Sequence, residues 1–96
     1  MYKPRVMQYL QMNDQGEPED QHYRIGAVAR LTGLSVDRLR AWERRYGVVT
    51  TRRGESMGRI YTRSDVERLG LLRRLVELGN AIGSIAHLSD AQLEAR

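Results

Sequence analysis

Arginine is the residue type of this 96-residue chain whose abundance and placement point most directly to chemistry. The stretch from residue 22 to residue 63 holds ten arginines against three acidic residues, a net charge of +7. The segments 1–21 and 64–96 carry net charges of −2 and −1, so all the positive excess lies in the middle. Because the planar guanidinium group matches phosphates and guanine edges with paired hydrogen bonds, this stretch predicts an anionic partner. A solvated charged surface is the alternative.

Four of these arginines fall on one face of a helix predicted over residues 36–46. At about 100° per residue, one face of that helix is apolar and is expected to pack inside: Val36, Leu39, Trp42 and Tyr46. The opposite face gathers polar and small residues: Asp37, Arg38, Arg40, Ala41, Arg44 and Arg45. A DNA major groove admits a helix, and the N-terminal part of such a helix reaches base edges. We therefore expect Asp37, Arg38 and Ala41 to contact bases. Phosphate contacts are expected from Arg40, Arg44 and Arg45.

Two further residues of this helix have alternative uses. Trp42 is expected to pack in the core, and contact of its indole N–H with a phosphate is a second use. Glu43 lies at the margin of the apolar face. Because an exposed carboxylate there would repel DNA, we expect Glu43 to form an ion pair with Arg40 or another nearby arginine.

A second arginine cluster consists of Arg52, Arg53 and Arg59, which flank a glycine-containing loop. A basic loop beside a recognition helix can lie along the DNA backbone or enter the minor groove. Tyr61 either offers its hydroxyl to a phosphate or is a half-buried strand aromatic, and the sequence fits both uses equally. These residues predict a basic wing.

The helix at 36–46 belongs to a predicted pair. A first helix is expected over residues 25–32, with Ala29 small enough to allow a close approach of the two helices. Gly33 permits the tight turn between them, and Ser35 is a good N-cap for the second helix. The pattern favours a helix-turn-helix, and an ordinary helical hairpin is the alternative.

The rest of the chain completes a fold that is mostly α with a small β-hairpin. The elements predicted are strands at 48–51 and 59–61, a helix from the Thr62 cap to Gly79, a shorter helix at 81–88, and a last fragment through Leu93. This gives a winged helix-turn-helix in the order helix, helix, hairpin wing, helix, helix. We expect one domain over 22–96, preceded by a flexible N-terminal tail over 1–21.

Composition argues against several classes of function. The chain has no cysteine, which excludes disulfides and thiolate metal sites, and no apolar run long enough to cross a membrane. His22 and His87 lie far apart, with no acid or nucleophile at catalytic spacing. We therefore expect a cytoplasmic, nucleoid-associated protein that is not an enzyme and binds neither a metal nor a membrane. A protein–protein adaptor remains the rival interpretation, and RNA binding ranks lower because the chain has no Phe.

Four motifs together resemble the MerR-type transcriptional regulators over roughly residues 23–88. The motifs are YRIG at 23–26, LRAWERRYG at 39–47, RIYT at 59–62 and DVERL at 65–69. The resemblance implies a winged-helix regulator that binds double-stranded DNA at a palindromic operator near a promoter. It also adds Arg24, in the first motif, to the candidate DNA-binding residues.

Ala41 and Trp42 stand where most members of that family carry two tyrosines. This form is similar to the CarA/CarH/LitR-like subgroup, some members of which carry a cobalamin-binding light sensor downstream. The resemblance therefore implies a repressor. It implies no cofactor in this chain, and a cobalamin-binding effector domain would belong to a longer full-length protein. It also implies that the full-length protein is a homo-oligomer, whereas residues 1–96 alone are expected to be monomeric.

Overall fold

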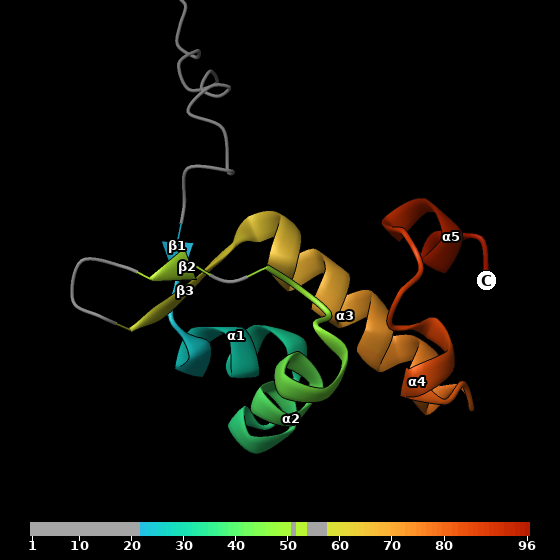
Figure 1. Ribbon diagram of the computed structural model, residues 1–96, viewed down its shortest axis with the longest axis horizontal. Coiled ribbons are helices and arrows are strands. Elements are labelled where there is room, and N and C mark those ends of the chain that lie inside the picture. Colours follow the sequence, from blue (N-terminus) through green and yellow to red (C-terminus); the bar gives the residue numbers. More distant parts are fainter. Residues whose placement is uncertain (1–21, 51, 54–57) are drawn as a thin grey trace, which may run out of the picture.

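The structure is a computed structural model that describes residues 22–50, 52–53 and 58–96. This part of the chain is mostly helical and carries one small antiparallel sheet (Figure 1). In chain order the elements are β1 (His22–Tyr23), α1 (Ile25–Thr32), α2 (Val36–Tyr46), β2 (Arg52–Arg53), β3 (Arg59–Thr62), α3 (Arg63–Glu77), α4 (Ile82–Ile85) and α5 (Asp90–Glu94). The predicted winged helix-turn-helix is confirmed. The tail expected at 1–21 lies outside the described residues.

The turn between α1 and α2 depends on Gly33, whose φ of 80° lies in the left-handed region that glycine adopts without strain. Its amide donates to the Ala29 carbonyl at 2.8 Å and so closes α1. α2 follows at once, because the Ser35 hydroxyl accepts a hydrogen bond from the Arg38 amide at 3.0 Å. A Cβ at position 33 would lie 2.8 Å from the guanidinium carbon of Arg73 in α3. Glycine therefore fixes the path from the first helix to the second.

The sheet has three strands rather than the predicted two, in the order β1-β3-β2. β1 pairs antiparallel with β3, with Tyr23 opposite Tyr61. The prediction of a strand at 48–51 is wrong, because residues 48–50 form no strand and the first wing strand is β2. Val48 is instead 3% exposed and belongs to the core. Val48 thus fills the interior before the wing begins, with Val49 packed partly against the core and Thr50 exposed.

α3 is the longest described helix, and it begins with the predicted capping box. The Thr62 hydroxyl accepts from the Asp65 amide at 3.1 Å, and the Asp65 carboxylate accepts from the Thr62 amide at 2.9 Å. α1 and β3 both pack against α3, which runs from the sheet toward α4 in Figure 1. α4 and α5 pack against it as well, and its buried leucines, Leu69, Leu72 and Leu75, belong to the core. The buried core comprises Val28, Leu34, Leu39, Trp42, Val48, Tyr61, Leu69, Leu72, Leu75, Ile85, Ala86 and Leu93.

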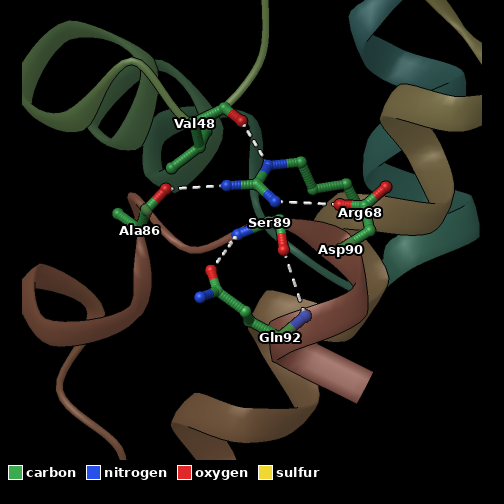
Figure 2. Close-up of polar contacts among 6 residues, drawn as sticks. All are labelled: Val48, Arg68, Ala86, Ser89, Asp90 and Gln92. Carbon is green, nitrogen blue, oxygen red and sulfur yellow. Dashed lines mark hydrogen bonds and ion pairs between the residues drawn. The ribbon is translucent and has the colours of Figure 1, made fainter. Parts of the chain in front are cut away.

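The first of the two C-terminal helices is shorter than the sequence suggests. The helix predicted at 81–88 is helical only over Ile82–Ile85, and α5 then starts after Ser89. The Ser89 hydroxyl accepts from the Gln92 amide at 3.2 Å, while the Gln92 side chain accepts from the Ser89 amide at 2.9 Å (Figure 2). This second capping box places Leu93, which is 1% exposed, in the core.

Arg68 of α3 joins this C-terminal region to the rest of the domain (Figure 2). Its Nε donates to the Val48 carbonyl at 2.6 Å, and its Nη2 donates to the Ala86 carbonyl at 2.7 Å. Its Nη1 lies 2.8 Å from the Asp90 carboxylate. One guanidinium group therefore ties the segment after α2, the end of α4 and the start of α5 to α3.

Candidate nucleic-acid interface

The outer face of α2 carries the arginines that the sequence assigns to it. Arg38, Arg40, Arg44 and Arg45 are all exposed, whereas Leu39 and Trp42 on the other face are buried. Asp37 is exposed in the first turn, and Ala41 is half-buried between the arginines. These exposures confirm the predicted polar face, and they confirm the predicted apolar face at Leu39 and Trp42. Because the side chain of Ala41 is small, the centre of the basic face protrudes less than the arginines around it.

Acidic side chains of the described residues leave most of these arginines unpaired. In the part of the chain that the structure describes, no acidic side chain pairs with Arg40, Arg44 or Arg45. The Arg38 guanidinium lies over the Trp42 ring, 6.0 Å from its centroid, a position suited to a cation–π contact. Such a face attracts anions, because its charge is not cancelled within the domain.

Tyr46 departs from its predicted place in the core, since it is 37% exposed. Its ring lies against α4, where a Cβ at Gly83 would be 3.6 Å from the Tyr46 ring carbon Cε1. The reason is position: Tyr46 occupies the last residue of α2, and the chain turns away at Gly47 with a φ of 58°. The apolar face of α2 is therefore buried at Leu39 and Trp42 but not at its C-terminal end, where Tyr46 lies.

Glu43 joins α2 to the wing strand β3. Its carboxylate accepts hydrogen bonds from the Arg59 guanidinium and from the Tyr61 hydroxyl, one on each oxygen. The Glu43 side chain is 5% exposed, and the Arg59 side chain is 50% exposed. The ion pair predicted for Glu43, with Arg40 or another nearby arginine, is confirmed, and its partner is Arg59. The reason is that Glu43 faces the sheet while Arg40 faces outward.

Tyr61 cannot contact a phosphate as the first of its two predicted uses requires. Its exposure is 0%, and its hydroxyl is already donated to Glu43. Burial, followed by the hydrogen bond to Glu43, raises the pKa of the Tyr61 phenol above its usual value. The phenol therefore stays protonated and acts as a donor inside the fold.

The wing and the segment before α1 supply the other basic residues. Arg52 and Arg53 form β2, paired with Ile60 and Arg59 of β3, and the predicted turn at 54–57 lies outside the described residues. Arg24 is exposed at the N-cap position of α1, and its guanidinium lies against Gly58, where any side chain would collide with it. Arg24 is thereby placed beside the base of the wing.

Other kinds of site find little support in the described residues. Within them, no group of three or more His, Cys, Asp or Glu side chains is arranged to hold a metal ion. No helix among those described is both long and apolar enough to cross a membrane. Sequence reasoning did not anticipate Arg68 as a structural residue, nor the contact of Arg24 with Gly58.

Comparison with known proteins identifies the family. The family described as MerR HTH family regulatory protein matches residues 23–92. The chain is 47% identical over 72 residues to the HTH-type transcriptional repressor CarH of Myxococcus xanthus, covering 75% of the chain and 24% of CarH. It is 44% identical over 55 residues to the HTH-type transcriptional repressor CarA of the same organism, covering 56% of the chain and 19% of CarA.

A more distant relative is the HTH-type transcriptional regulator ZntR of Escherichia coli K12. The chain is 32% identical to it over 72 residues, covering 75% of the chain and 51% of ZntR. The chain thus spans about a quarter of CarH and about half of ZntR. The predicted similarity to CarA and CarH is confirmed by these matches. The chain belongs to the MerR HTH family of regulatory proteins.

Proposed function

We propose that residues 22–96 are the DNA-reading domain of a transcriptional regulator, with α2 in the major groove of double-stranded DNA. One observation carries the proposal: the second helix of a helix-turn-helix has a buried apolar face and an outer face of exposed arginines. Three of those arginines have no acidic partner among the described residues. On binding, these arginines would neutralise DNA phosphates and release the cations condensed on the DNA, which contributes a large part of the affinity.

Each side chain has a separate proposed role. Asp37, Arg38 and Ala41, in the first half of α2, face base edges. The residues assigned to phosphates are Arg40, Arg44 and Arg45. The wing residues Arg52, Arg53 and Arg59, with Arg24 beside them, follow the backbone or the minor groove. Trp42 supports Arg38 from beneath, because 6% exposure leaves little of its ring for DNA.

The names of two relatives support a proposal for the biological setting. CarH and CarA are both described as transcriptional repressors, and we propose repression for this protein, at the bacterial nucleoid and without catalysis. A palindromic operator bound by two copies fits a regulator of this kind.

Selection of binding sites from a random DNA pool tests this function. We expect the wild-type chain to enrich a defined sequence, and a palindrome would show that two copies bind together. Arg38→Ala should relax the preference at one base position, by about 1–3 kcal/mol of discrimination. Wild-type protein that enriches no sequence would contradict sequence-specific binding.

A protein–protein adaptor is the second candidate, favoured by two large apolar side chains on the surface. Leu31 is 61% exposed and Leu78 is 73% exposed. Partner binding through such residues would be insensitive to salt, unlike binding to DNA. The salt dependence of binding therefore separates the two candidates.

A further inference from the structure

Glu43 is an acidic residue on the helix that is proposed to meet DNA, and its placement calls for a reason. It neighbours Arg44 and Arg45 in the sequence, yet its side chain is 5% exposed and pairs with neither of them. Instead both carboxylate oxygens accept donors from β3, the guanidinium of Arg59 and the hydroxyl of Tyr61. The carboxylate of Glu43 is therefore paired inside the domain, with two residues of the wing strand β3.

This link matters because α2 and the wing have little other direct connection. Among the closely packed element pairs, α2 lies against α1, while β3 lies against α1, α3 and the two other strands. In Figure 1, α1 stands between the sheet and α2. In the described residues, the hydrogen bonds between side chains of α2 and β3 are the two that Glu43 accepts. Arg59, the donor of one of them, also pairs with β2 through Arg53.

A second observation concerns the donors. Tyr61 is fully buried, so its hydroxyl has a fixed position and can orient the carboxylate. Arg59 meets Glu43 through Nη1, and its side chain is half-exposed. Glu43 thus holds an arginine whose side chain the domain covers only in part. A buried carboxylate with two donors is a rigid support of the kind that binding sites need.

On the function proposed above, we infer that Glu43 is a positioning residue for DNA binding. Its carboxylate sets the wing strand against α2, so that Arg59 and the arginines of α2 meet the same duplex together. Glu43 itself touches no DNA. Its loss should uncouple the wing from the helix while leaving both elements folded.

The sign of the effect separates this role from simple electrostatics. Glu43→Gln keeps the shape of the side chain and one acceptor oxygen, and it raises the net charge of the chain from +4 to +5. Electrostatics alone predicts tighter binding to DNA, because a negative charge has been removed. A positioning role predicts weaker binding, by about tenfold, which corresponds to about 1.4 kcal/mol.

Glu67→Gln provides the matched control. It makes the same change of charge, and Glu67 also pairs with an arginine, Arg63 at 3.3 Å, but within α3 and with a side chain that is 65% exposed. We expect this control to bind DNA as tightly as wild type or slightly more tightly. Tyr61→Phe is the second test variant, because it removes one donor to Glu43 without altering any charge at neutral pH.

The experiment measures duplex affinity of the 96-residue chain and these variants over a range of salt concentrations, well below each melting temperature. We expect Glu43→Gln and Tyr61→Phe to bind more weakly, with a shallower slope of log affinity against log salt, because the wing loses phosphate contacts. A role in stability alone would lower the melting temperature and leave affinity and slope unchanged. Should Glu43→Gln fail to fold, Tyr61→Phe decides the question by the same two readouts.

The outcomes distinguish this inference from the function on which it rests. Wild-type binding together with variants that match Glu67→Gln in affinity and slope would overturn the role of Glu43 and leave the proposed function intact. A wild-type chain that binds no duplex would overturn both.

Discussion

Tyr61 illustrates how a single side chain can be removed from an interface by the fold. Its hydroxyl lies at a wing position where a phosphate contact is chemically reasonable, yet the ring is fully buried and donates to Glu43. The neutral phenol is the form that can donate this hydrogen bond. Ionisation would bury the phenolate and place a second negative charge beside the Glu43 carboxylate, so the folded state resists it.

This resistance predicts how stability depends on pH. In the folded state the pKa of Tyr61 is raised above the ordinary phenol value of 10.0. The unfolded state therefore releases the phenol proton first as the pH increases. The stabilisation is therefore complete below about pH 10 and is lost progressively above it. We expect wild type to exceed Tyr61→Phe in melting temperature at about pH 8, and the gap to shrink between about pH 10 and pH 11. A gap that stays constant over this range would show that the phenol ionises equally in both states.

At the scale of the elements, the apolar period and the caps were sufficient to predict most helices. Ser35, Gly33 and Thr62 mark ends of elements through local hydrogen bonds or backbone angles, which neighbouring residues alone determine. The two faces of α2 follow from its period in the same way. These features need no knowledge of the tertiary structure, and the sequence therefore predicts them correctly.

The features that the sequence did not reveal depend on contacts between distant residues. β1 has two residues, too few to show any period, and exists because β3 lies beside it. Val48 is a β-branched residue of the kind that strands favour, but it packs in the core outside any strand. Glu43 has arginine neighbours along its own helix, and only the fold shows that Arg59 is its partner. Each of these depends on tertiary packing, which overrides local preference.

Arg68 is the clearest case of such a residue, and its stability effect can be predicted. It is an arginine in a basic chain, but its side chain is only 17% exposed and serves three separate acceptors. Arg68→Lys keeps the charge and loses the planar fork, so it cannot reach all three. We expect the free energy of unfolding, measured by urea denaturation, to fall by about 1.5–3 kcal/mol.

The same substitution at Arg63 is the control for Arg68. Arg63 is on the same helix and its side chain is 51% exposed, with a single ion pair to Glu67. Exposed pairs of this kind contribute little, so Arg63→Lys should change stability by less than about 0.5 kcal/mol. Equal losses for the two variants would contradict the role given to Arg68 in joining α4 and α5 to the domain.

At the scale of the whole molecule, charge is distributed unevenly along the chain. The net charge of +4 results from a strongly basic middle stretch and two weakly acidic flanks. α2 and the wing both belong to that middle stretch, whereas most of α3 and all of α4 and α5 belong to the acidic one. Such an asymmetric charge orients the domain as it approaches an anionic partner. Within this basic stretch, α2 and the wing strand β3 are also linked in the fold, through the ion pair of Glu43 with Arg59.

The salt dependence of duplex binding by wild type and Arg44→Ala tests the central claim most directly. Arg74→Ala is the matched control, since Arg74 is also exposed but lies on α3 beside Leu93 of α5. We expect wild-type affinity to fall steeply with added salt, and Arg44→Ala to weaken binding to all duplexes alike and reduce the slope by about one. Arg74→Ala should leave the slope unchanged. Wild-type binding that ignores salt, or an Arg44→Ala variant that binds like Arg74→Ala, would contradict the docking of α2 on DNA.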